Sequence, residues 1–228
     1  MPSRKPVPAV LPWLTALAAA PLVVIVAAVA ATRFGGVDVG LAYDVLTWTV
    51  ARGLAWVALA AALVVAGLAF RDLKGRGLYA VAALILAGTA VVGFQVQAAS
   101  LATETPRDVT SNGAEPPTFS RLAAIHRGQT PAGPDACTAA RSIPTQVLAQ
   151  QAAAALVDAS FPVVRATTFE VEGVHEGAWF GFAHDAVVRI RPGRTDIRVA
   201  ARDRTRPDGG ATCRLAGKLA DALEAAAR

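Results

Sequence analysis

Arginine is the residue type whose spacing in this chain most clearly suggests chemistry. Eight arginines lie within the 26 residues from Arg189 to Arg214. Four of them fall on alternate positions of two expected strands and would share one polar sheet face: Arg189, Arg191, Arg198 and Arg202. Guanidinium groups match the geometry of carboxylates and phosphates, so this face could bind an anionic ligand, a lipid headgroup or a partner. The alternative is a ladder of cross-strand ion pairs with neighbouring acids, namely Glu170, Glu172, Asp185 and Asp196.

An enzyme site would need titratable groups that meet in one cleft. The residues that could build one are Asp108, His184, Asp185, Arg198 and Asp208. The pairs His175–Glu176 and His184–Asp185 could also supply metal ligands, but no spacing typical of a metal site appears among the three histidines. Signatures of serine nucleophiles, phosphate loops and dinucleotide sites are absent from the sequence. We therefore expect no metal and no cofactor, and we favour a protein that is not an enzyme.

The distribution of hydrophobicity and charge sets the elements that must carry these residues. The 228 residues are 54% hydrophobic and 17% charged, whereas a soluble domain has about 25% charged residues. The sequence pI is near 9.9. Residues 1–99 carry 7 Lys and Arg against 3 Asp and Glu, and residues 100–228 carry 15 against 14. Because the basic excess lies in the apolar half, nucleic-acid binding is not expected.

Three long apolar segments predict a transmembrane region over residues 1–101. We expect spans at about 12–32, 54–70 and 78–99, each long enough to cross about 30 Å of hydrocarbon. The segments 33–52 and 71–77 are expected to be the loops between them. A cleaved signal peptide is the alternative for the first span, although an apolar stretch of more than 20 residues favours an anchor. None of the expected spans holds an ionisable residue, which favours an anchor or a helix bundle over a pore.

The basic residues of the loops predict the orientation. One side carries Arg4, Lys5, Arg71, Lys74 and Arg76 against a single acid, and the other side has two basic and two acidic residues. Positively charged loops remain in the cytoplasm. We therefore expect the N-terminus and the 71–77 loop to be cytoplasmic and the C-terminal part to lie outside the cytoplasm.

The C-terminal part reads as one α+β domain. Residues 102–118 are expected to be a linker leading into a domain at 119–228. Hydrophobic periodicity predicts a helix over 145–160, strands over 163–172, 175–182, 186–191 and 195–203, a turn at Pro192-Gly193-Arg194 and a helix over 211–227. Short connections favour a four-stranded antiparallel sheet with both helices on one face, as a two-layer sandwich. Cys137 and Cys213 could form a disulfide in an oxidising compartment or be two buried free thiols.

Three runs of this domain resemble a bacterial family catalogued as domain of unknown function 1499. They are Arg107 to Ser111 with Glu115 to Phe119, Glu172-Gly173 with Trp179 to Ile190, and Asp196 to Arg198 with Arg202 and Asp208. The resemblance covers about 105–225. It departs from the family pattern at His184, Val199, Ala201 and Thr212, where the family usually has Asp, Ser, Ser and Asn. The resemblance implies membrane-anchored proteins of Gram-negative envelopes and no settled reaction.

The sequence thus predicts a bacterial inner-membrane protein with a periplasmic α+β domain. We expect the domain to bind an envelope partner or an anionic ligand through its arginine face, and the helices to contact the bilayer. One alternative is a membrane-anchored periplasmic enzyme with an Asp/His/Arg site. Another is a structural subunit whose helices assemble with other membrane proteins or with further copies of the chain.

Overall fold

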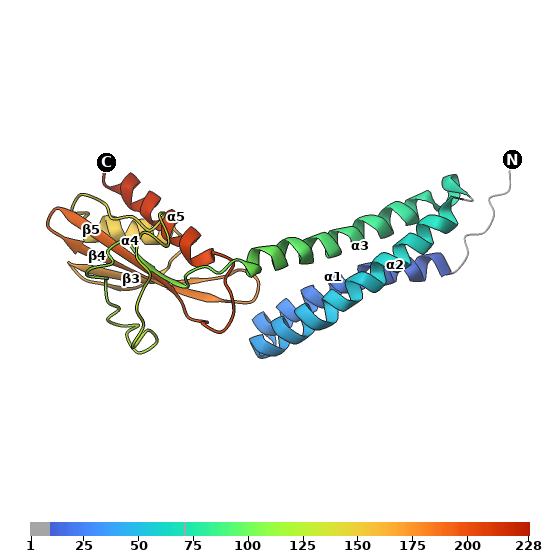
Figure 1. The fold of residues 1–228 in the computed structure, drawn as a ribbon, viewed down its shortest axis with the longest axis horizontal. Coiled ribbons are helices and arrows are strands. Elements are labelled where there is room, and N and C mark those ends of the chain that lie inside the picture. Colours follow the sequence, from blue (N-terminus) through green and yellow to red (C-terminus); the bar gives the residue numbers. More distant parts are fainter. Residues whose placement is uncertain (1–9, 71) are drawn as a thin grey trace. The chain divides into compact units, whose positions relative to one another are not determined.

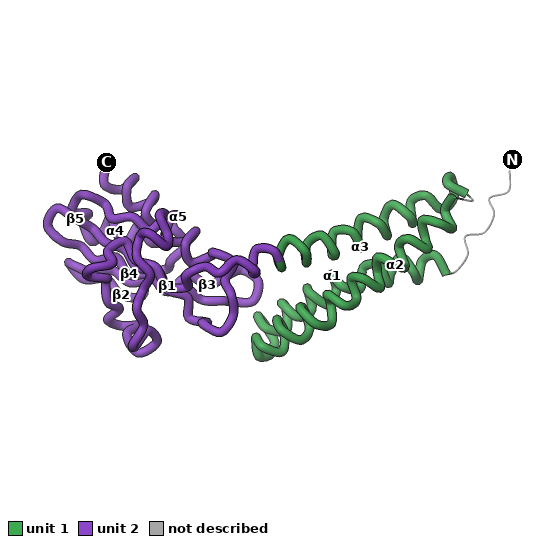
Figure 2. Tube along the Cα trace, in the orientation of Figure 1, with its two compact units in different colours: residues 1–98 green, residues 99–228 purple. Residues whose placement is uncertain are grey.

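The structure is a computed structural model that describes residues 10–70 and 72–228. The chain divides into two compact units between Ala98 and Ala99 (Figures 1 and 2). Unit 1 consists of helices, and unit 2 contains a sheet with two helices. Arg4, Lys5 and Arg71, which contribute to the predicted orientation, lie outside the described residues.

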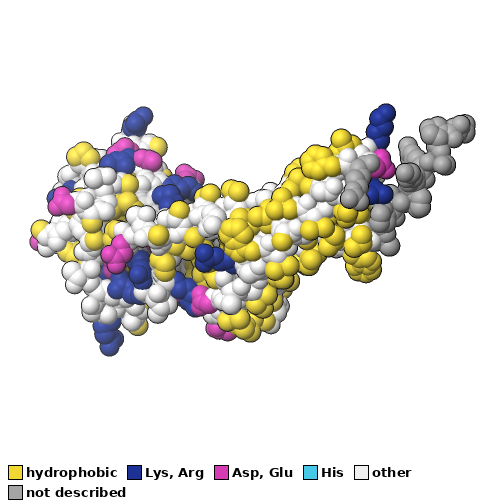
Figure 3. Space-filling view, turned by 45° about the vertical axis from the view of Figure 1, so that its right-hand side comes forward, with side chains coloured by type: hydrophobic (Ala, Val, Ile, Leu, Met, Phe, Trp, Pro, Cys, Tyr) yellow, Lys and Arg dark blue, Asp and Glu magenta, His cyan; other side chains and the backbone are white. Residues whose placement is uncertain are grey.

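The described part of unit 1 provides three helical segments that are long and apolar enough to cross a membrane. They are α1 (Val10–Phe34), the continuous pair η1 (Gly40–Ala51) and α2 (Arg52–Ala69), and α3 (Leu73–Ala102). Figure 3 shows hydrophobic side chains over most of the visible helix surface, whereas both charge signs are interspersed on unit 2. Fully buried alanines such as Ala58, Ala62, Ala83 and Ala87 pack together in unit 1, as close helix packing requires.

Both predicted loops of the membrane region are largely helical instead. In the segment 33–52, η1 is a π-helix in which the Thr47 and Thr49 hydroxyls donate to carbonyls five residues earlier. The Trp48 ring packs edge-on against Phe94, which adds apolar contact to a stretch expected to be a loop. In the segment 71–77, the Asp72 carboxylate accepts the Gly75 N–H at 3.1 Å and caps a helix that starts at Leu73.

Unit 2 is built on a five-stranded antiparallel sheet with the order β1-β5-β4-β3-β2. The strands are β1 (Asp108–Thr110), β2 (Val163–Ala166), β3 (Glu170–Glu176), β4 (Ala183–Arg191) and β5 (Arg194–Ala201). The extra edge strand β1 comes from the segment expected to be a linker. It pairs with β5, so Asp108 lies opposite Ala200. The expected class is confirmed as α+β, but the strand count of four was wrong.

Two of the predicted strands were placed incorrectly, while the β4–β5 hairpin was predicted well. The expected strand 163–172 is interrupted by a turn in which the Thr167 hydroxyl accepts the Glu170 N–H. The expected strand 175–182 ends at Glu176, because the Gly177 N–H donates to the Phe182 carbonyl and closes a loop. The predicted Pro-Gly turn joins β4 to β5, with Gly193 at a φ of 71°.

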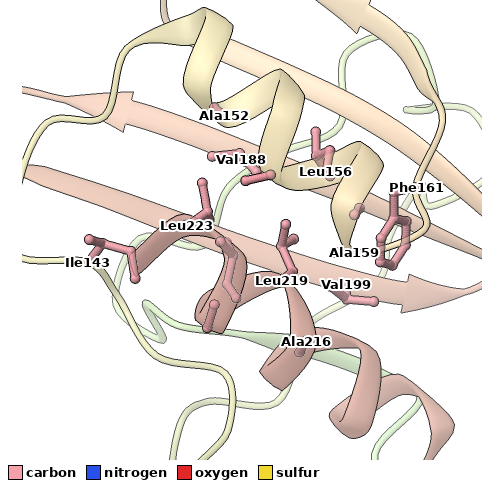
Figure 4. Packing of buried hydrophobic residues seen from close by; sticks show 14 of the residues in the cluster. Ile143, Ala152, Leu156, Ala159, Phe161, Val188, Val199, Ala216, Leu219 and Leu223 are labelled. Carbon is pink, nitrogen blue, oxygen red and sulfur yellow. The ribbon is translucent and has the colours of Figure 1, made fainter. Parts of the chain in front are cut away.

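The helices α4 (Ala149–Asp158) and α5 (Ala211–Ala226) pack on one sheet face and bury the main core. Leu156, Phe161, Leu219 and Leu223 meet Val188 and Val199 of the sheet there (Figure 4). A disulfide joins Cys137, in the loop before α4, to Cys213 in the first turn of α5. The first predicted helix is shorter than expected. It begins after Leu148, and the Thr145 carbonyl accepts the Thr195 hydroxyl.

The opposite sheet face, expected to be open to solvent, is covered by an irregular stretch that we call the covering segment (residues 111–135). Phe119 and Leu122 from this segment form a second, smaller core with Val187 and Ala200 of the sheet. The polar sheet residues Glu172, Asp185, Asp196 and Arg198 are consequently all buried, with relative exposures of 0–5%. The alternation of side chains was therefore right, but the identification of the polar face with solvent was wrong.

Candidate functional site

Arg198 and Asp108 form a buried ion pair between β5 and β1. The Arg198 Nε and Nη2 atoms donate to the two Asp108 oxygens at 2.9 and 2.8 Å. Arg198 also donates to the Pro117 carbonyl, and its guanidinium carbon lies 5.2 Å from the centre of the Phe119 ring. Because it is 5% exposed and fully engaged, Arg198 anchors the covering segment and is not available to a ligand.

A second buried group connects Arg202, Asp185 and His126. Arg202 donates from Nε and Nη2 to Asp185, and His126 Nε2 lies 2.8 Å from Asp185 Oδ2. Burial alone would raise the pKa of Asp185, but hydrogen bonds from His126 and Arg202 outweigh it and hold that pKa below its usual range. The His126 ring also stacks on Phe119 at 4.3 Å. His126 was not among the predicted site residues, since its partner lies 59 residues further along the chain.

Glu172 binds backbone rather than the arginines proposed as its partners. Its carboxylate accepts the N–H groups of Ser120 and Arg121, where the chain turns across the sheet. Glu170, the other proposed acid of β3, lies 4.0 Å from Arg165 at the sheet edge. Of the four acids proposed for an ion-pair ladder, Asp185 and Asp196 do pair with the predicted arginines.

Three arginines converge on Asp196 and form what we call the hairpin arginine cluster (Arg189, Arg191 and Arg194). They contact the Asp196 oxygens at 3.1, 2.8 and 2.7 Å, respectively. Asn112 and Ser142 donate to the same carboxylate. Burial alone would raise the pKa of Asp196, but these hydrogen bonds more than compensate and hold it well below its usual range.

The hairpin arginine cluster has more positive charge and more donors than its acids use. Arg191 pairs with Glu115, so three guanidinium groups share two carboxylates. The side chains of Arg189, Arg191 and Arg194 are 24%, 35% and 45% exposed, unlike Arg198 at 6%. Within residues 10–70 and 72–228, nothing accepts from the buried Arg189 Nε. The arrangement can therefore accept a further carboxylate or phosphate at the β4–β5 hairpin.

The residues proposed for an acid–base site are divided between the two sheet faces. Asp108 and Asp185 both lie opposite Ala200 in the register and share the covered face with Arg198. His184 lies opposite Ala201 and His175, on the helix-covered face. Its Nε2 is 3.9 Å from Asp208 Oδ2. The structure thus separates this set into buried ion pairs on one face and His184 with Asp208 on the other.

Asp208 organises the start of α5. Its Oδ2 accepts the Thr212 N–H at 2.8 Å, and its Oδ1 accepts the Thr105 hydroxyl at 2.9 Å. Burial would raise the pKa of Asp208, but neighbouring His184, Thr212 and Thr105 outweigh it and hold the pKa well below its usual range. Across the described ranges, no group of three or more His, Cys, Asp or Glu side chains is placed to hold a metal ion.

The comparison with protein families places these features in context. A family model described as protein of unknown function (DUF1499) matches residues 108–223. The chain belongs to this family. No curated protein and no solved structure matches the chain. The DUF1499 match begins at the first residue of β1 and ends within α5, so it covers the sheet, the covering segment and both arginine-rich strands. The three apolar helices precede the matched region.

Proposed function

We propose that this DUF1499 protein is an inner-membrane protein whose unit 2 lies in the periplasm and binds an anionic group of an envelope partner or ligand. The binding site is the hairpin arginine cluster. The observation that supports it is the convergence of three partly exposed guanidinium groups on the fully buried Asp196. Such a cluster is held in place by its own carboxylate while its guanidinium groups stay partly exposed, so little ordering is needed when an anion binds.

The proposed site includes only two of the four arginines predicted to bind a ligand, Arg189 and Arg191. Arg198 is enclosed by Asp108 and the covering segment, and Arg202 donates three hydrogen bonds to Asp185. Arg194, which sits just after the hairpin turn, replaces these two in the site. The enzyme alternative has less support, because its proposed residues lie on two different faces of the sheet. Those on the face under the covering segment already form hydrogen bonds within ion pairs, as Arg198 does with Asp108.

Binding is tested with the full chain in a non-ionic detergent. A fluorescein-labelled hexaglutamate peptide serves as the carboxylate probe, and inorganic pyrophosphate serves as a competing phosphate. Replacing Arg191 and Arg194 with Gln should weaken peptide binding by at least tenfold, since each lost charge-assisted hydrogen bond contributes about 1.5–3 kcal/mol. Raising the salt concentration should weaken binding to the wild-type chain.

The matched control is Arg141→Gln. The Arg141 side chain is 37% exposed and pairs with Asp221 and Glu224, so it resembles Arg191 in exposure and pairing but lies outside the cluster. This variant should bind the peptide as the wild type does. Equal loss in both variants, or no measurable binding of either anion to the wild type, would remove the cluster as an anion site.

The proposed orientation is tested independently with fusions to alkaline phosphatase, which is active only in the periplasm. A fusion after Arg228 should be active, and one placed within residues 71–77 should be inactive, because positively charged loops stay in the cytoplasm. The reverse pattern would place unit 2 in the cytoplasm and contradict the proposal.

A further inference from the structure

Three connecting segments of unit 2 gather at one end of its sheet. They are residues 103–107 before β1, residues 177–182 between β3 and β4, and residues 202–210 after β5. The strand register brings them together, because the Ala201 N–H donates to the Arg107 carbonyl and the Arg202 N–H donates to the Ala183 carbonyl. The β4–β5 turn and the hairpin arginine cluster lie at the other end of the same strands.

This end of the sheet packs against the last turn of α3, residues 99–102, which belongs to unit 2. A Cβ on Gly209 would lie 3.3 Å from the Ser100 hydroxyl and 3.5 Å from a Leu101 methyl carbon. Three residues after α3 ends, the Thr105 hydroxyl donates to Asp208 and accepts the Gly210 N–H. The first residues of unit 2 are therefore held at this end of its sheet.

The length of the uncharged part of α3 places Ser100 close to the membrane surface. No charged residue occurs from Gly77 to Ala102 within the helix. At 1.5 Å per residue this stretch is about 39 Å long, which exceeds the hydrocarbon core of about 30 Å and approaches the thickness of the bilayer with its headgroups. Ser100 therefore lies at headgroup depth when α3 crosses the membrane, and so do the segments packed against it.

The loop 177–182 presents an aromatic residue at this same end. Trp179 is 63% exposed, whereas its neighbour Phe180 is 8% exposed and packs near Phe182 with ring centres 6.3 Å apart. Backbone hydrogen bonds from Gly177 to Phe182 and from Gly181 to Gly177 close the loop. Trp is enriched where a bilayer meets water, because its ring is apolar and its indole N–H is polar.

We propose that the loop 177–182 contacts the headgroup layer of the bilayer that α3 crosses, with Trp179 as the principal contact. This inference does not depend on anion binding by the arginine cluster. The contact is aromatic rather than electrostatic, since the segment 202–210 holds both acidic and basic residues. It gives unit 2 a second contact with the membrane besides α3.

The experiment compares two aromatic positions of matched exposure at opposite ends of β3. Trp179→Cys and Phe169→Cys are each labelled with a small fluorophore in the full chain. Phe169 is 64% exposed and lies in the β2–β3 turn directly before β3, a strand of seven residues that spans about 23 Å. The native Cys137 and Cys213 are joined in the disulfide, so the label reports on the introduced cysteine. The labelled chains are reconstituted into phosphatidylcholine vesicles with or without a lipid that carries a nitroxide on its headgroup.

The label at position 179 should be quenched at least twofold more strongly than the label at position 169, and high salt should leave this difference unchanged. Position 178 is exposed and adjacent to Trp179, so a label at Ala178→Cys leaves the indole in place. This label should be quenched like the label at position 179, which controls for any effect of removing Trp179. Equal quenching at both ends, or no quenching at positions 178 and 179, would overturn the proposal.

Discussion

Replacing Asp196 with Asn should weaken the fold and strengthen anion binding at the same time. The substitution keeps the shape of a fully buried side chain and removes the negative charge that Arg189, Arg191 and Arg194 share. Removing one partner of a buried ion pair costs about 3–5 kcal/mol. Because the three arginine side chains are 24–45% exposed and can regain water, we expect the lower end, about 3 kcal/mol.

This cost is a large fraction of the stability of an ordinary domain, which is about 5–15 kcal/mol. Unit 2 spans residues 99–228. With an unfolding entropy of about 2.1 cal/mol/K per residue, the unfolding temperature should fall by roughly 10 °C. Loss of a negative charge about 6 Å from a bound anion should tighten anion binding roughly tenfold at a dielectric constant between those of protein and water.

Calorimetry of the full chain in detergent measures the first quantity, with unit 2 identified as the transition that also shifts when the disulfide is reduced. Polarisation of the labelled hexaglutamate peptide measures the second. An unchanged unfolding temperature would show that the Asp196 contacts contribute little to stability. Weaker peptide binding would show that Asp196 matters more for positioning the arginines than for repelling a bound anion. That result would refute the expected electrostatic effect.

Two further predictions concern the stability of unit 2. Replacing Cys137 and Cys213 with Ala removes a cross-link over 76 residues, so the chain-entropy relation predicts a loss of about 4.5 kcal/mol and roughly 15 °C by calorimetry; a reductant should then have no further effect, and a shift of under 3 °C would contradict the argument. Acid should also destabilise unit 2, because two carboxyl groups have a lowered pKa in the folded state. The pKa of Asp196 is depressed. Burial alone would raise the pKa of Asp203, but hydrogen bonds from Thr205 and Arg206 outweigh burial and lower that pKa to about 2. A depressed carboxylate pKa stabilises the fold above the unfolded value near 3.8 and loses that contribution as pH falls. The unfolding temperature should therefore decline from about pH 4 to pH 2, less steeply in Asp196→Asn, and a decline that starts near pH 6 would point to histidine instead.

The elements that could be predicted from the sequence are those specified by local pattern. The β4–β5 hairpin combines strict alternation with a Pro-Gly turn, and α5 has helical periodicity over 16 residues. β1 could not be predicted, because three residues carry no period and they pair with β5, some 90 residues away. The aromatic run after Glu176 has strand-like composition, but its glycines close a loop, and composition alone does not show this.

The candidate site could be predicted in part, because alternation indicated Arg189 and Arg191 but neither Arg194 nor the burial of Arg198. Alternation correctly placed Glu172, Asp196 and Arg198 on one face, but it carries no information about what lies above that face. The covering segment has no helical or strand period. It is held by contacts that connect distant positions, such as Ser120 to Glu172. Such long-range contacts therefore determine which arginines remain accessible to a ligand. Contacts between residues 50 or more positions apart cannot be predicted from the local sequence pattern.

The two proposals together narrow the kind of ligand that the arginine cluster can meet. Trp179 and Ser100 lie at the end of the sheet from which α3 departs, and the cluster lies at the β4–β5 turn. β4 has nine residues, so its ends are about 30 Å apart at 3.3 Å per residue. If the loop 177–182 rests on the membrane that α3 crosses and the strands run along its normal, the headgroups of that membrane cannot reach a site displaced by this length. The anion should then belong to a molecule in the aqueous compartment or to an opposing surface, and vesicles of anionic lipid should not compete with the hexaglutamate peptide when the chain is already reconstituted in them.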